Sequence, residues 1–157
     1  MNSFELIEYR SEFKNAIKEL NIEWLEKYFE LEPNDIVQPS YPEKEILYKG
    51  GKIYYAKYLG EIVGTFSLLK LNDDTFELGK MAVTDRVQGL GIGNFMMEQC
   101  LLIATEMVIK KLILYSNTKL ASAIHLYKKF GFVEVPMEAG HYKRSNIKME
   151  KIIFESI

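Results

Sequence analysis

The hydrophobic pattern changes its period in the middle of the chain, and this change limits the fold more than any other feature. Apolar and polar residues alternate in three successive runs, KIYYAKY, IVGTFSLLKL and TFELGKMAV, between residues 52 and 83. A period of two is typical of β-strands. Short turn sequences, LGE at 59–61 and NDD at 72–74, separate the runs. Strands joined by such short turns pair antiparallel, so we expect an antiparallel meander.

Helical periodicity precedes the meander. Apolar residues recur every three or four positions from residue 13 to residue 28, which predicts an amphipathic helix that begins at Ser11 and that Pro33 ends. The alternating run FELIEY (4–9) predicts a first strand, and SYPEKEILYKGG (40–51) predicts a short helix with Pro42 near its start and two glycines as its stop.

A β-α-β unit follows the meander. NFMMEQCLLIATEMVI (94–109) predicts a long apolar helix, and the almost wholly apolar KLILYS (111–116) predicts a central strand. TKLASAIHLYKKF (118–130) predicts a second helix capped by Gly131, and FVEV and NIKMEKIIF predict two late strands. With 157 residues, the whole chain, 1–157, is expected to form a single mixed α/β domain whose helices cover a mixed sheet.

Composition argues against several classes of protein. A net charge of −2 with no basic stripe favours neither nucleic acid nor an anionic membrane as partner. No apolar run approaches the roughly 18 residues of a membrane span. The first residues do not combine a basic segment with an apolar one, and Cys100 is the only cysteine. We therefore expect a cytoplasmic protein without an internal disulfide.

Three alternating glycines stand between the third meander strand and the long helix, in the run Gln88-Gly89-Leu90-Gly91-Ile92-Gly93. A dinucleotide-binding G-x-G-x-x-G would need its third glycine at Asn94 or Met96, and a P-loop would need lysine after the last glycine. Both patterns fail. The amide groups at the start of a helix are nevertheless unpaired, and the helix dipole favours an anion there. The run predicts either a phosphate or pyrophosphate site, or a tight turn that binds nothing.

The run also fits the pattern Q/R-x-x-G-x-G/A directly after the strand ELGKMAV, and this combination resembles motif A of the GNAT superfamily of N-acetyltransferases. AIHLYKKFGF (123–132) resembles the superfamily segment A-I-x-L-Y-x-x-x-G-F, and YKRSNIKM (142–149) resembles a tail common in bacterial members. The resemblance implies a mostly antiparallel sheet of about seven strands flanked by about four helices. In that fold the strands Thr75–Val83 and Lys111–Ser116 form a splayed parallel pair.

The function implied by this resemblance is transfer of the acetyl group of acetyl-CoA to a primary amine, by direct attack in a ternary complex. The amine would belong to a small molecule or a peptide, and no metal, nucleic acid or membrane is implied. A homodimer is compatible with the fold. The alternative is an acetyl-CoA or CoA sensor or interaction domain that lacks catalysis.

The resemblance also places the coenzyme on particular residues. Backbone groups of Met81, Ala82 and Val83 are expected to pair with the pantetheine arm. The amides expected to hold the pyrophosphate are those of Gln88, Gly89, Leu90, Gly91, Ile92, Gly93 and Asn94. Asn117 either bonds the arm or caps the next helix. Lys128 and Lys129 either reach the 3′-phosphate of the coenzyme or form a solvated face.

Two residues are catalytic candidates by the same resemblance. Tyr127 matches the family tyrosine near the coenzyme sulfur, where it would also contact the coenzyme and act as general acid; the alternative is a core tyrosine with its hydroxyl at the surface. Glu77 could take the proton of the amine, directly or through water, or it could be a solvated or Lys80-paired glutamate. Glu77 shares a face with Met81 and Val83 only if the strand has no bulge.

Other reactive residues are assigned to the core or left without a role. Cys100 lies in an apolar helix and is expected in the core. His125 and His141 are too isolated for a metal site. Trp24, Tyr28 or Tyr41 could line the acceptor pocket, because the first two helices of this fold shape it.

Overall fold

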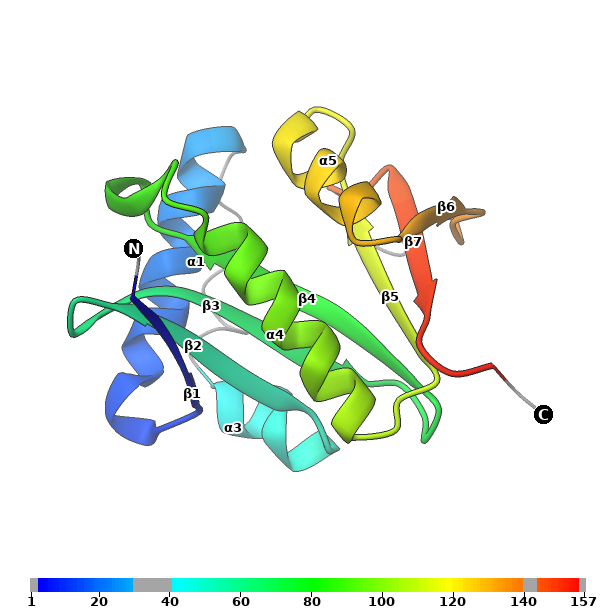
Figure 1. The fold of residues 1–157 in the computed structure, drawn as a ribbon, viewed down its shortest axis with the longest axis horizontal. Helices are drawn as coiled ribbons and strands as arrows, with labels where there is room; N and C mark the ends of the chain where they lie inside the picture. The colour runs from blue at the N-terminus through cyan, green and yellow to red at the C-terminus, as the bar shows by residue number, and fades with distance from the viewer. Residues whose placement is uncertain (1–2, 30–40, 140–143, 156–157) are drawn as a thin grey trace.

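The computed structural model describes residues 3–29, 41–139 and 144–155, and within them it contains a seven-stranded sheet in the order β1-β2-β3-β4-β5-β7-β6 (Figure 1). Every neighbouring pair is antiparallel except β4 and β5, which are parallel. The predicted meander, the parallel pair and the mixed sheet are therefore confirmed. The strands are β1 (Phe4–Glu8), β2 (Lys52–Tyr58), β3 (Glu61–Lys70), β4 (Thr75–Val83), β5 (Lys111–Ser116), β6 (Val133–Val135) and β7 (Ile147–Ile152).

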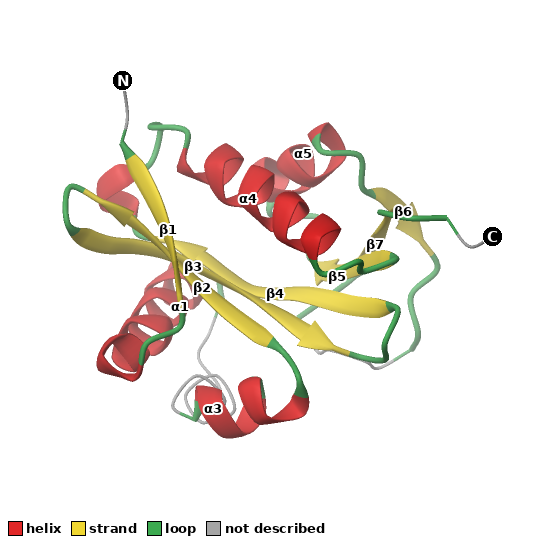
Figure 2. Cartoon of the chain, turned by 60° about the horizontal axis from the view of Figure 1, so that its bottom comes forward, coloured by secondary structure: helices red, strands yellow, loops and turns green. Residues whose placement is uncertain are grey.

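Helices cover both faces of this sheet, with α4 and α5 on one face and α1 and α3 on the other (Figure 2). The α-helices are α1 (Lys14–Tyr28), α3 (Pro42–Glu45), α4 (Ile92–Glu106) and α5 (Ala121–Lys129), and the short 3-10 helices are η1 (Ser11–Phe13), η2 (Leu47–Lys49) and η3 (Asp85–Val87). Among the helices of the described segments, none is both long enough and apolar enough to cross a membrane.

The alternation of β2 divides the core into two clusters. Tyr54 and Ala56 point toward α4, where they join a large cluster that includes the buried Met96 and Cys100. Ile53 and Tyr55 point to the opposite face, where they pack with Ile17 of α1 and Ile46 in a smaller cluster. A strand buried on both faces needs apolar side chains in both registers, which explains why KIYYAKY is only weakly alternating.

Helix ends differ from the predicted ones by a few residues. The first helix ends at Tyr28, because Phe29 is extended (φ −143°, ψ 172°), and Pro33 lies outside the described residues. The long helix begins at Ile92 and ends at Glu106, and Val108 beyond it has a positive φ of 57°. Hydrophobic periodicity reports burial, which continues past the last helical hydrogen bond, so it overestimated these helices at their C-terminal ends.

Candidate functional site

The parallel pair β4–β5 separates part of the way along its length. Its paired residues are Thr75 with Lys111, Phe76 with Leu112, and Glu77 with Ile113. Beyond these pairs β4 continues to Val83 and β5 continues to Ser116 without further pairing between them, while β5 stays paired with β7. The edge of β4 that faces β5 therefore carries backbone groups without a strand partner between residues 78 and 83.

A β-bulge interrupts β4 at Lys80, three residues after Glu77. Gly79 faces Ser67 and Ala82 faces Thr65, so two residues of β4, Lys80 and Met81, stand opposite one residue of β3. Lys80 has a positive φ of 53°, an uncommon and strained conformation for a residue with a side chain. The added residue reverses the alternation, as a bulge does.

The bulge separates the carboxylate from the side chains that follow it. Met81 and Val83 pack against the α4-side cluster together with Leu78. In a regular strand Glu77 would share their face, but here it lies on the opposite face from all three. The structure therefore has the bulged arrangement and not the regular one.

Glu77 lies at the point where β4 and β5 diverge, and only 7% of its surface is exposed. It lines a pocket of about 130 Å³ together with Leu69, Gly79, Lys80, Tyr115 and Ser145. A Cβ atom at Gly79 would lie 3.8 Å from the Glu77 Oε2 atom and 3.2 Å from the Leu69 Cδ1 atom. Glycine at this position thus keeps space beside the carboxylate. Because Lys80 lines the same pocket, pairing with Glu77 remains an alternative to a catalytic role.

One rim of this pocket carries a polar cluster that the sequence did not indicate. The Tyr115 hydroxyl donates to Glu138 Oε2 at 2.8 Å, and Lys148 Nζ donates to Glu138 Oε1 at 2.6 Å. The hydrogen bond from Lys148, then bonds from the backbone and from Tyr115, lower the pKa of Glu138 to about 2. Tyr115 is thereby tied to the segment that follows β6.

The structure gives two different reasons why glycine occupies these positions of the predicted anion loop. Gly89 and Gly91 have φ values of 83° and 85°, and a Cβ atom at either would meet nothing within 4 Å. Glycine is therefore required at these two positions by the backbone conformation and not by a lack of space for a side chain. Gly93 has ordinary dihedrals, but its Cβ would lie 3.4 Å from Leu126, so it allows α5 to approach α4 closely.

The loop presents backbone amides at the start of α4. Gly91 is the N-cap residue and offers no side-chain cap. Within the part of the chain that the structure describes, the N–H groups of Gly89, Gly91, Ile92 and Gly93 donate no hydrogen bond. Unpaired amides at the positive end of a helix of 15 residues form a suitable site for an anion.

Side chains of α1 hold this loop in place. The Glu23 carboxylate accepts hydrogen bonds from Thr84 Oγ1 at 3.0 Å and from the Asp85 amide at 2.9 Å. Lys27 Nζ and Gln88 Nε2 both donate to Asp85 Oδ1 at 2.8 Å. The side chain of Gln88, which opens the motif, thus fixes the loop internally.

Tyr127 lies on α5 and packs, partly buried, against the α4-side cluster, with its ring centroid 6.1 Å from that of Phe132. Its hydroxyl forms no hydrogen bond within residues 3–29, 41–139 and 144–155. Burial, with a smaller effect of Cys100, raises the pKa of Tyr127 to about 12. Burial also raises the pKa of the fully enclosed Cys100 to about 12, which makes this thiol a packing residue and a poor nucleophile.

Asn117 follows β5 and uses both atoms of its amide inside the protein. Its Nδ2 donates to the Arg144 carbonyl at 2.7 Å, and its Oδ1 accepts from the Lys119 amide at 3.0 Å. Helix α5 begins at Ala121 with Leu120 as N-cap residue, so the proposed capping role of Asn117 is wrong. Contact with the coenzyme stays a prediction.

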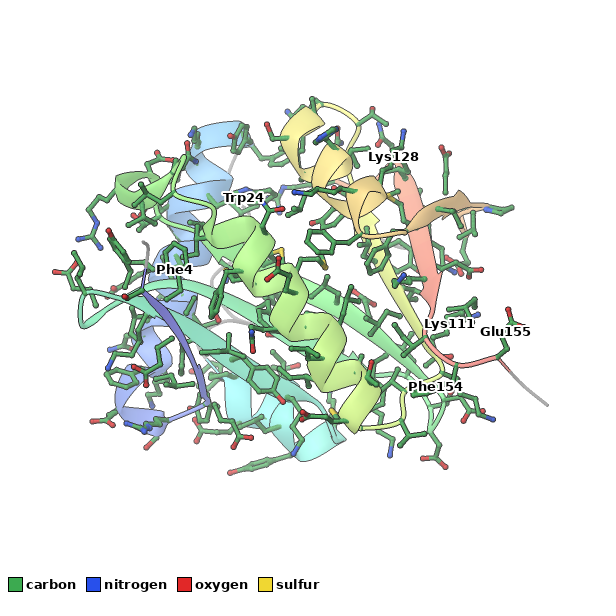
Figure 3. All side chains as sticks on the ribbon, in the orientation of Figure 1. Phe4, Trp24, Lys111, Lys128, Phe154 and Glu155 are labelled. Carbon is green, nitrogen blue, oxygen red and sulfur yellow. The ribbon has the colours of Figure 1, made fainter. Side chains whose placement is uncertain are left out.

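Aromatic residues gather at the C-terminal end of α1. The Trp24 ring centroid lies 5.7 Å from that of Tyr28 and 5.8 Å from that of Phe29. Lys119 Nζ lies 4.2 Å from the Phe29 centroid, which links α1 to the loop before α5. Figure 3 labels Trp24 on α1 and the exposed Lys128 on α5.

Of the remaining predicted residues, one is exposed, one contacts the start of α4 and one lies outside the described residues. Tyr41 is 60% exposed, and Lys129 donates to the Asn94 side chain at the start of α4. His141 lies outside the described residues. In the described segments, no three His, Cys, Asp or Glu side chains are placed to hold a metal ion.

Comparisons with known proteins agree with this geometry. The model of the acetyltransferase (GNAT) family matches residues 15–132, and no curated protein matches the sequence. The fold is similar to that of a GNAT acetyltransferase from Staphylococcus aureus Mu50, with 23% identity over 96% of this chain and 99% of that chain and a TM-score of 0.84.

Two further solved structures contain ligands. A spermidine N-acetyltransferase from Vibrio cholerae in complex with CoA and spermine is 19% identical, with 95% of each chain covered and a TM-score of 0.75. A GNAT acetyltransferase from Elizabethkingia anophelis with acetyl-CoA bound is 22% identical, with 95% of this chain and 97% of that chain covered and a TM-score of 0.65. At these identities the likeness concerns the fold.

The rim cluster generates a prediction about pH. Because the folded-state pKa of Glu138 lies near 2 and its ordinary value is 4.5, its stabilising contacts act fully above about pH 4.5 and are lost as the pH falls through 2. We expect the carboxyl carbon of Glu138 to titrate near pH 2 by NMR in the wild type, and closer to 4.5 in Lys148→Met. An unchanged midpoint in Lys148→Met would show that Lys148 is not the main cause.

Proposed function

This chain belongs to the GNAT acetyltransferase family, and from that premise we propose that it is an acetyl-CoA-dependent N-acetyltransferase acting on a primary amine. The observation that carries the proposal is the position of the amides of Gly89, Gly91, Ile92 and Gly93, which donate no hydrogen bond to a described residue, beside the part of β4 that is not paired with β5. A pyrophosphate at the loop would direct a pantetheine arm along that edge, toward the point where β4 and β5 diverge.

The residues expected to hold the coenzyme would do so mainly through their backbone N–H and C=O groups. The amides of residues 88–94 would bind the pyrophosphate, although that of Gln88 already donates to the Asp85 carbonyl at 3.2 Å. Lys129 adds positive charge beside Asn94, whereas the charge of Lys27 is paired with Asp85. Met81, Ala82 and Val83 would pair with the arm as an added strand. The edge of β4 that they would use is not paired with β5.

The two catalytic candidates lie on different sides of the expected thioester position. Glu77 opens into the pocket on the α1 side of the sheet, while Tyr127 packs on the α4 side. Glu77, directly or through one water, would take a proton from the ammonium group, and the neutral amine would attack the thioester carbonyl. A backbone amide near Val83 would stabilise the oxyanion before the carbon–sulfur bond breaks. Much of the rate gain would come from holding both reactants in place.

The raised pKa of Tyr127 sharpens its role. A phenol with a pKa of about 12 is fully protonated at neutral pH and can donate a hydrogen bond to the departing thiolate. Complete proton transfer to a thiolate whose conjugate acid has a pKa of about 8.5 would be uphill by about 5 kcal/mol. Tyr127 would therefore act as general acid chiefly through this hydrogen bond, with the proton passing to sulfur late in bond cleavage.

The proposal is tested by incubating the protein with acetyl-CoA and a panel of amines that includes spermidine, lysine peptides and amino acids. We expect release of the CoA thiol together with a product heavier by one acetyl group, measured by mass spectrometry. Calorimetry with CoA runs in parallel. Binding of CoA without turnover of any amine would favour the non-catalytic sensor, and absence of CoA binding would contradict both.

Tyr127→Phe tests the proton donor. We expect kcat to fall about 10- to 100-fold while KM for acetyl-CoA changes little, because only the bond to the leaving sulfur is lost. Tyr58→Phe is the matched control, since Tyr58 is also partly buried against the same cluster. Full turnover with an unchanged pH profile in Tyr127→Phe would remove this residue from the mechanism.

Gly91→Ala tests the loop. With φ at 85°, alanine is strained by about 1 kcal/mol, and relief of the strain turns the amides away from the anion. We expect KM for acetyl-CoA to rise about fivefold or more. Gly60→Ala is the control, since Gly60 has a φ of 82° and equally open surroundings in the turn between β2 and β3, outside the predicted coenzyme residues. Equal effects of the two substitutions on KM would contradict the pyrophosphate site.

A further inference from the structure

A second pocket lies between β1, β2 and the last turns of α4, away from the proposed active site. Its volume is about 390 Å³, within the usual range for small-molecule sites. Apolar walls come from Leu6, Ile103 and Met107, and polar groups come from Glu8, Lys52, Tyr54 and Glu106. The 15 residues of α4 separate it from the anion loop by about 20 Å.

The fold places these groups by simple geometry. Glu8 of β1 stands directly opposite Tyr54 of β2, so their side chains share the face that α4 covers. The Tyr54 ring stacks on Phe66 with centroids 5.3 Å apart, which fixes its direction. On α4, Ile103, Glu106 and Met107 are three and four residues apart and therefore lie on one side of the helix.

Tyr54 is the observation that indicates a ligand. Only 6% of its surface is exposed, and its hydroxyl forms no hydrogen bond to any residue in the described segments. Among the described side chains, Ser67 Oγ is the fully enclosed polar atom without a partner, so the Tyr54 hydroxyl is not enclosed and opens into the pocket that it lines. The protein offers this hydroxyl no partner among its described residues, and a donor or acceptor bound in the pocket would supply one.

The charges around the pocket favour a cation. Glu8 and Glu106 supply two carboxylates against one ammonium group, that of Lys52, and none of the three forms an ion pair with a described residue. Burial is the main cause that raises the pKa of Tyr54 to about 12, and the carboxylates of Glu8 and Glu106 add smaller effects in the same direction. The pocket also lies at the C-terminal end of α4, where the helix dipole favours positive charge.

We propose that this pocket binds a small organic cation, a protonated amine attached to a short apolar chain. The ammonium group lies between Glu8 and Glu106 and donates a hydrogen bond to the Tyr54 hydroxyl. The apolar chain lies against Leu6, Ile103 and Met107. Two carboxylates and a phenol do not make the oxygen cage that a hard metal ion requires, whereas the apolar wall suits carbon. The site uses neither Glu77 nor Tyr127, so it is independent of the proposed catalysis.

The experiment uses the whole chain with isoleucine and methionine methyl groups labelled for NMR, titrated with n-hexylammonium chloride. We expect saturable shifts of the Ile103 and Met107 methyl resonances. Hexan-1-ol and sodium hexanoate at equal concentration are the neutral and anionic controls, and CaCl₂ tests a metal ion. The methyl groups of Ile113 and Met81 report the proposed active site separately.

Two variants and one matched control locate the cation. Glu106→Gln should weaken hexylammonium binding about five- to tenfold, and Tyr54→Phe about threefold. Glu98→Gln removes the same charge from an exposed position of the same helix and should leave the affinity unchanged. Thermal melting checks that each variant is folded.

Each outcome either supports the proposed site or overturns it. Shifts at Ile103 and Met107 that Glu106→Gln weakens and Glu98→Gln does not would support the site, whether or not Ile113 and Met81 also shift. The proposal is overturned by shifts at Ile113 and Met81 alone, by equal responses to hexanol or hexanoate, by a response to CaCl₂ alone, or by no response up to 20 mM of probe, a test limit of about 2 kcal/mol in binding free energy.

Discussion

The parallel pairing of β4 with β5 ends at Glu77 and Ile113, and the rest of the site depends on that ending. Three paired positions keep the two halves of the sheet together, while the following residues of β4 are not paired with β5. The same ending puts Glu77 where the strands diverge, with its side chain on the α1 side. If β4 and β5 were paired along their whole length, they would satisfy those backbone groups and leave no edge for an extended ligand.

Helix α1 contributes to the site although it covers the face of the sheet opposite to α4 and α5. Glu23 and Lys27 contact the start of the loop through Thr84 and Asp85, so the loop is held before any anion arrives. Preorganisation of this kind lowers the entropy lost on binding. Phe29 at the end of the same helix lies against Lys119, which connects α1 to the β5 half of the sheet.

The strands and their order could be predicted from the sequence, because alternation and short turns are local signals that directly encode antiparallel neighbours. The glycine loop could be found by its residue types, and its positive φ values at Gly89 and Gly91 agree with that interpretation. The bulge at Lys80 could not, since lysine carries no preference for a positive φ. Nor could the cluster of Tyr115, Glu138 and Lys148, because it forms only when β7 pairs with β5 and also with β6, the strand that precedes Glu138. The catalytic and coenzyme assignments stay predictions.

The additional residue at Lys80 sets the parity of β4. This one residue decides whether the Glu77 carboxylate lies on the same face of the sheet as Met81 and Val83 or on the opposite face. Deleting that residue would leave the composition of the strand almost unchanged, yet it would turn Met81 and Val83 out of the core or Glu77 into it. Substitutions in β4 are thus far easier to accommodate than a change of its length by one.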